Sequence, residues 1–86
     1  MGNEANPKIL TATASSAFGS CLLFGFNINK TLSGTLVLKE SGTAIANFAI
    51  GTSPGMYHKV ANGARYTNLT MELSTTDDVT AFTRKV

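Results

Sequence analysis

The sequence predicts an all-β protein, a small antiparallel β-sandwich or partly open barrel of six to seven strands. Residues 33–40 and 43–50 alternate in polarity on either side of Ser41-Gly42, which is the pattern of a β-hairpin with a two-residue turn. Residues 68–74 and 78–82 continue the alternation, and no segment shows a helical period. Strand-like segments recur about every ten residues, as is typical of small sandwiches and barrels.

The N-terminal third is expected to contain a polar arm and two strands. Residues 1–7 form the expected arm because glycine, asparagine and proline disfavour regular structure, and residues 8–86 are expected to form a single β-sandwich domain. A first strand is predicted at 8–14, a small-residue loop at 15–19 and a central strand at 21–29. In the central strand one face is predicted to carry Leu22, Phe24, Phe26 and Ile28.

Glycines mark the expected bends and turns. Gly25 stands between two phenylalanines, which predicts a bend or a close backbone approach on the outer face of the strand. Gly42 provides the positive φ that a two-residue hairpin loop requires. Residues 51–55 are expected to form a loop, residues 56–60 a short strand or extended segment and Asn62-Gly63 another tight turn. Beyond it one half-buried strand is predicted to bury Leu69, Met71 and Leu73.

The small size of the chain predicts association with other subunits. A chain of 86 residues supports one modest core, and domains of this size usually gain stability from disulfides, metals or association. Cys21 is the only cysteine and lies in an apolar run, so we expect a buried thiol and no internal disulfide. His58 is the only histidine, and no metal-ligating pattern is present. Association therefore remains as the expected source of stability.

Charge argues against nucleic acid and for close packing of surfaces. The net charge is +2, and the seven basic residues are scattered without interleaved aromatics, so we expect no direct nucleic-acid binding. Charged residues make up only 14% of the chain, which lowers the cost of desolvating surfaces that come together. The polar N-terminus carries no export signal, and no apolar run approaches the ~20 residues of a spanning helix, so no membrane association is expected.

Residue types for catalysis are present but lack any supporting pattern. A hydrolytic triad would have to use His58 with Ser41 or Cys21 and Asp77, and no motif or spacing supports it. The adjacent Asp77 and Asp78 fit a solvated turn, and the glutamates fit polar strand positions. We therefore expect no enzyme, no cofactor and no bound metal.

One small group of residues has two interpretations. Tyr57, His58 and Tyr66 either form a polar-aromatic patch that binds a sugar, or pack at the rim of the core. The sequence leaves both open.

The hairpin, its flanking loop and the closing strands resemble small structural proteins encoded by tailed bacteriophages. The residues that carry this resemblance are 35–39, 41–42, 44–49, 51–52, 54–57, 69–74 and 78–80, and the similarity extends over residues 8–84. The resemblance implies a non-enzymatic β-sandwich component of the virion, such as a capsid decoration or cement protein that binds the shell in multiple copies.

The expected partners follow from that resemblance and from the predicted arm. We expect a homo-oligomer, first of all a trimer, that binds the major capsid protein or another virion protein after synthesis in the bacterial cytoplasm. The expected contact residues are Asn3, Glu4, Asn6, Pro7, Tyr57, His58 and Tyr66. The alternative is a glycan- or receptor-binding tip module of a phage fibre or tail.

Overall fold

The computed structural model describes residues 6–10 and 14–86, which form a single antiparallel sheet of seven strands. The strands are β1 (Asn6–Leu10), β2 (Ala14–Ile28), β3 (Leu36–Glu40), β4 (Thr43–Phe48), β5 (Gly55–Tyr57), β6 (Ala64–Leu73) and β7 (Val79–Lys85). The predicted all-β class with six to seven strands is confirmed. No helix in the described part of the chain is long and apolar enough to cross a membrane.

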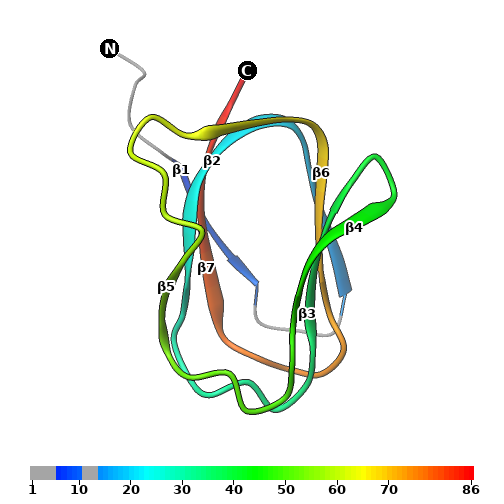
Figure 1. Cartoon of the computed structure of the whole chain (residues 1–86), viewed down its shortest axis with the longest axis vertical. Coiled ribbons are helices and arrows are strands. Elements are labelled where there is room, and N and C mark those ends of the chain that lie inside the picture. Colours follow the sequence, from blue (N-terminus) through cyan, green and yellow to red (C-terminus); the bar gives the residue numbers. More distant parts are fainter. Residues whose placement is uncertain (1–5, 11–13) are drawn as a thin grey trace.

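The sheet is curled into a partly open barrel. Its strand order is β1-β7-β2-β6-β3-β4, and β5 pairs with β2 beside this path. Figure 1 shows the long strands β2 and β6 arching over from the side of β5 and β7 to the side of β3 and β4. A strand that bends in this way lets one sheet enclose a core without a second sheet.

Two irregularities in β2 produce its curvature. The register with β6 shifts on both sides of Gly19, and the register with β7 shifts between Leu23 and Gly25. The predicted loop at 15–19 is therefore wrong, because this segment belongs to a bulged strand. The predicted first strand at 8–14 also differs: β1 begins at Asn6, and Ala14 already belongs to β2.

The bulge near Gly25 also corrects the prediction that Leu22, Phe24, Phe26 and Ile28 share one face of β2. Cys21 and Leu23 are buried before the bulge, whereas Phe26 and Ile28 are buried after it. Strict alternation would place Cys21 and Leu23 on one face and Phe26 and Ile28 on the other, and the extra residue of the bulge brings both pairs to the same face. Leu22 and Phe24 are only half-buried and do not share the buried face of Phe26 and Ile28 as predicted.

The turn of the hairpin between β3 and β4 matches the prediction, although both strands are shorter than the predicted 33–40 and 43–50. Glu40 pairs with Thr43 across Ser41 and Gly42, whose φ angles of 51° and 85° are both positive. This is the geometry of a two-residue type I′ turn, in which glycine carries no steric penalty. One extra residue, Ile45, lies in β4 where the register with β3 shifts.

The core lies inside the curve of the sheet. Strands β2, β3, β6 and β7 contribute buried side chains to it, whereas β4 and β5 add only partly buried ones. Its buried members are Cys21, Leu23, Phe26, Ile28, Leu32, Leu36, Leu38, Leu69, Met71, Leu73, Val79 and Ala81. The predicted burial of alternate residues in residues 68–74 is confirmed, and so is the free, buried thiol of Cys21.

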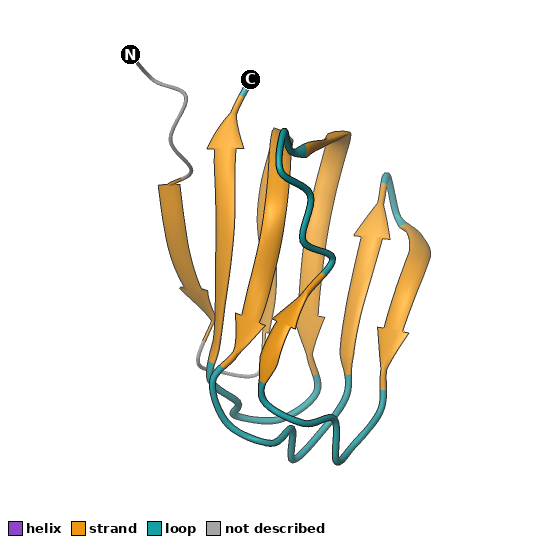
Figure 2. Cartoon of the chain, turned by 60° about the vertical axis from the view of Figure 1, so that its left-hand side comes forward, coloured by secondary structure: helices purple, strands orange, loops and turns teal. Residues whose placement is uncertain are grey.

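Three loops meet at one end of the barrel, which we call the base (residues 29–35, 49–54 and 74–78). Figure 2 shows these connections together below the strands. Leu32 N–H donates to Thr52 O at 3.1 Å, and Gly51 N–H donates to Leu32 O at 2.9 Å. Ser74 N–H donates to Thr35 O at 3.0 Å, so the loop at 29–35 is bonded to both of the others.

Candidate functional site

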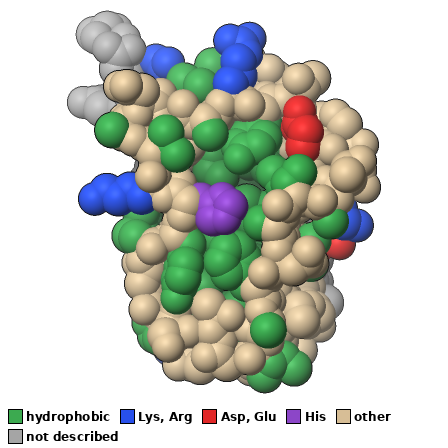
Figure 3. Space-filling model, in the orientation of Figure 1, with side chains coloured by type: hydrophobic (Ala, Val, Ile, Leu, Met, Phe, Trp, Pro, Cys, Tyr) green, Lys and Arg blue, Asp and Glu red, His purple; other side chains and the backbone are tan. Residues whose placement is uncertain are grey.

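The barrel is open between β4 and β5. β4 pairs with β3 and β5 pairs with β2, but the two do not pair with each other. We call β4, β5 and residues 58–60 together the open flank. Figure 3, which has the orientation of Figure 1, shows hydrophobic side chains around the single histidine in the middle of this face.

Aromatic rings bridge the open flank. The Phe26 ring from β2 lies 5.3 Å from the Phe48 ring and 6.0 Å from the Tyr57 ring, centroid to centroid. The Phe48 and Tyr57 rings are 5.4 Å apart in an edge-on arrangement. The His58 imidazole completes the cluster, 5.8 Å from Phe26 and 5.6 Å from Phe48. Side-chain packing therefore replaces the hydrogen bonds that would join β4 to β5 in a closed barrel.

The backbone of residues 58–60 runs close over β2, and Gly25 makes this approach possible. A Cβ atom at Gly25 would lie 3.2 Å from Lys59 Cα and 3.2 Å from Tyr57 O, and the φ of Gly25 is 135°. Val60 N–H donates to Phe24 O at 3.1 Å. The predicted close backbone approach at Gly25 is thus confirmed.

His58 is held in an unusual backbone conformation. Its φ is 53°, in the left-handed region that non-glycine residues seldom adopt. Such a conformation costs of the order of 1 kcal/mol and persists only where the surroundings hold it. Here the ring contacts with Phe26 and Phe48 hold it, and the residue remains exposed.

The structure brings together two of the three aromatic residues named from the sequence. Tyr57 and His58 share the cluster, and the Tyr57 hydroxyl donates to Ser53 O at 2.6 Å. Tyr66 lies elsewhere, on β6 opposite Cys21. Burial first, and the Glu40 charge second, raise the pKa of the Tyr66 phenol. The three residues therefore do not form one patch, and both Tyr57 and Tyr66 pack against the rim of the core.

The remaining residues named from the sequence lie at the N-terminus. Asn3 and Glu4 are outside the described residues. Asn6 and Pro7, expected in the arm, pair with Thr83 and Phe82 of β7 as the first residues of β1.

The open flank is free of formal charge over most of its length. From Ser41 to Tyr57 the sequence contains no Asp, Glu, Lys or Arg. Ile45, Ile50 and Met56 are large apolar residues of this segment, with exposed fractions of 45%, 70% and 43%. Sequence reasoning missed these residues as contact candidates, although the long uncharged run was a signal for them. A surface of this kind can contribute apolar contacts and backbone hydrogen bonds to a partner.

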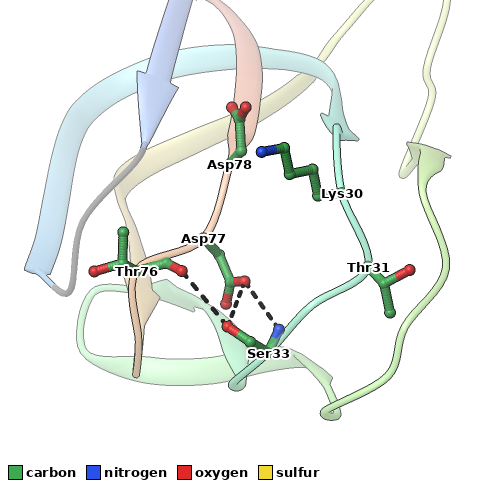
Figure 4. A pocket seen from close by; sticks show the side chains of 6 residues that line it. All are labelled: Lys30, Thr31, Ser33, Thr76, Asp77 and Asp78. Carbon is green, nitrogen blue, oxygen red and sulfur yellow. Dashed lines mark hydrogen bonds between the residues drawn. The ribbon is translucent and has the colours of Figure 1, made fainter.

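A second, polar region lies at the base. Lys30, Thr31, Ser33, Thr76, Asp77 and Asp78 line a groove of about 380 Å³. Figure 4 shows that the Asp77 side chain points at Ser33 across this groove. Both the N–H and the hydroxyl of Ser33 donate to Asp77 Oδ1 at 2.9 Å. Gly34 N–H donates to Oδ2 at 3.2 Å, and Thr75 Oγ1 donates to Oδ2 at 3.0 Å.

This network corrects the prediction that Asp77 lies in a solvated turn, because the residue is only 7% exposed. Burial by itself disfavours the charged carboxylate, but the bonds from Ser33, Thr75 and Gly34 outweigh it and hold the pKa of Asp77 below its ordinary value. With four donors on its two oxygens, the carboxylate joins the loop before β3 to the loop before β7. Its role in the structure is to hold the base together.

Metal binding has no support in the described residues, since no group of three or more His, Cys, Asp or Glu side chains there could hold an ion. Comparison with protein-family models, with curated proteins and with solved structures finds no match for this chain. The geometry of the open flank and of the base therefore carries the functional argument.

Proposed function

We propose that the protein is a non-enzymatic structural subunit that works in multiple copies, and that its assembly is a bacteriophage particle in which it decorates or cements the shell. The observation that carries the proposal is the open flank, where an unclosed sheet presents exposed apolar side chains and the strands β4 and β5 carry no formal charge. Sheet edges and apolar patches of this kind promote protein–protein contact.

The distribution of polar groups supports a role in contact. The best-connected carboxylate, Asp77, is saturated by hydrogen bonds within the base. Glu40 accepts from the N–H groups of Thr67 and Asn68, and Lys39 pairs with Glu72 at 3.2 Å. These charged groups serve the fold, which leaves the apolar side chains of the open flank as the surface for partners.

Assignment to a phage particle rests on the resemblance over residues 8–84, and composition fits it. A low charge density lets neighbouring subunits pack closely, and weak contacts repeated over a shell add up through effective concentration. The major capsid protein or another virion protein is the proposed partner, reached in the particle after synthesis in the bacterial cytoplasm.

The test is quantitative mass spectrometry of particles purified from the bacterium that expresses the gene. We expect the chain in the particles at a fixed, high ratio to the major shell protein, and imaging of particles with an affinity-tagged chain should place it on the shell. Its absence from washed particles would overturn the proposal.

A glycan- or receptor-binding module is the second candidate. It is favoured by one observation, the exposed His58 imidazole beside Tyr57. A glycan array probed with the full chain and with Tyr57→Ala tests it. A sugar ligand that the substitution abolishes, in a chain absent from particles, would establish this candidate in place of the first.

A further inference from the structure

The two ends of the strand order differ in how they protect their unpaired edges. β1 contains Pro7 and Lys8, the residue types with which natural sheets block the addition of another strand. β4 contains Thr43, Ala44, Ile45, Ala46, Asn47 and Phe48, with neither charge nor proline. Only its short length and the extra residue Ile45 work against strand addition.

The hydrogen-bonding direction of β4 follows from the neighbouring ladder. Thr35 O accepts from Ser74 N–H and Ser41 N–H donates to Asn68 O, so these residues of the β3 chain segment point toward β6. In an antiparallel strand the direction alternates, and Leu36 and Leu38 therefore point toward β4. Their partners Phe48 and Ala46 point back at β3, which leaves the N–H and C=O of Asn47, between them, directed out of the sheet.

We propose that a second copy of this chain pairs with β4 along this edge, as an antiparallel β4–β4 contact about a two-fold axis. Two identical edges meet without like-charge repulsion only if the edge itself is uncharged, and this edge carries no formal charge from Ser41 to Tyr57. An antiparallel arrangement lets Asn47 of each copy donate to and accept from the other strand. Ile45, 45% exposed, lies beside the same contact.

This inference deepens the proposed function, on which it rests, by naming one contact through which copies associate. A six-residue strand makes a small interface, so we expect a dissociation constant of roughly 10 to 100 μM for the free dimer. The contact also differs from the trimer expected from the sequence, because a two-fold contact joins copies in pairs.

Sedimentation equilibrium tests the proposal. It is carried out on the unmodified full chain and on the Ile45→Lys variant, each from micromolar to submillimolar concentration. This substitution places a lysine on each β4 edge, which is how natural sheets block strand addition, and we expect it to weaken dimerisation at least tenfold. Val86→Lys is the matched control, since Val86 is exposed to nearly the same extent (44%) but follows β7, which three other strands separate from β4 in sheet order. It should leave the dissociation constant unchanged.

Amide hydrogen exchange followed by NMR provides a second, independent measurement on the unmodified chain. The Asn47 amide should exchange more slowly as concentration rises through the dissociation constant, while the exposed amide of Asn62 in its turn should not change. A trimer, a dimer insensitive to Ile45→Lys, or an Asn47 amide that stays unprotected would overturn the β4–β4 contact. Each of these leaves the proposed function standing if the chain is found in particles, whereas a β4–β4 dimer absent from particles would overturn the particle assignment alone.

Discussion

The base and the open flank close the same barrel by different means. At the base, the buried Asp77 carboxylate accepts four hydrogen bonds, and backbone bonds join the loops on either side. Across the open flank, β4 and β5 are held together by the rings of Phe26, Phe48, Tyr57 and His58 without strand pairing. Directional polar bonds fix one region, and non-directional apolar contacts close the other.

This difference indicates which contacts of the fold can rearrange when a partner binds. A saturated buried carboxylate is costly to disturb, because the backbone N–H groups of Ser33 and Gly34 that donate to it would lose their acceptor. Ring contacts can shift or be replaced by the side chains of another subunit at little cost, since apolar contacts are not directional. The substitutions below test this division, from the largest expected effect to the smallest.

Asp77→Ala should have the largest effect, a loss of about 3 kcal/mol in the free energy of unfolding. The substitution leaves the N–H groups of Ser33 and Gly34 without their acceptor. Urea denaturation measures the loss. Asp78→Ala is the control, because Asp78 accepts a side-chain bond from Asn29 at 2.8 Å and lies less deeply in the structure, so it should cost about 1 kcal/mol. Equal losses for the two variants would contradict the special role of Asp77.

Gly34→Ala should cost about 2 kcal/mol in unfolding free energy. A Cβ atom at this buried position would overlap the hydroxyl groups of Ser74 and Thr75, which themselves bond Thr35 and Asp77. Thermal unfolding measures the change. In Gly51→Ala the added Cβ meets open space, and only its φ of 91° is unfavourable, so the loss should be about 1 kcal/mol. If Gly34→Ala were the milder of the two, close packing at the base would not matter.

The fold was largely predictable because its signals are local. Alternation in residues 68–74 and the Ser41-Gly42 turn each follow from a few adjacent residues, and the structure confirms both. The inward face of β2 could not be predicted in full, because one extra residue near Gly25 reverses the alternation that Leu22 and Phe24 would otherwise follow.

The sites were harder to predict because they depend on contacts between distant residues. Asp77 looks like a turn residue among Ser and Thr neighbours, and only the fold brings Ser33 to it. Tyr66 seemed equivalent to Tyr57 and His58 by residue type, yet strand order separates it from them. The uncharged run around Ile45 was visible in the sequence, but its meaning depends on β4 being the last strand of the sheet.

Phe48→Ala should cost about 1.5 kcal/mol in the free energy of unfolding, less than Asp77→Ala or Gly34→Ala, because the ring is only half-buried. Its contacts with Phe26, Tyr57 and His58 are all lost. Hydrogen exchange should show faster opening of the open flank with the base still protected. Phe48→Leu, which keeps apolar volume, should recover at least half of the loss. Exchange that accelerates equally at the base would mean that the two regions open together.

Acid should lower the free energy of unfolding by protonating Asp77 in the loops at the base of the barrel, and near neutral pH this effect should be smallest. Because the pKa of Asp77 is lower in the folded chain than in the unfolded chain, its ionised form stabilises the fold above the unfolded pKa of about 4. That contribution falls as the pH drops from there through the lowered pKa. Urea denaturation of Asp77→Asn between neutral and strongly acidic pH should show lower stability at neutral pH and a flatter decline in acid.

Glu40, whose pKa is lowered by the N–H groups of Asn68 and Thr67, adds a similar dependence of stability on pH, so Glu40→Gln serves as the comparison. If Asp77→Asn declined in acid as steeply as the unmodified chain, the carboxylate at the base would not be the group that acid titrates.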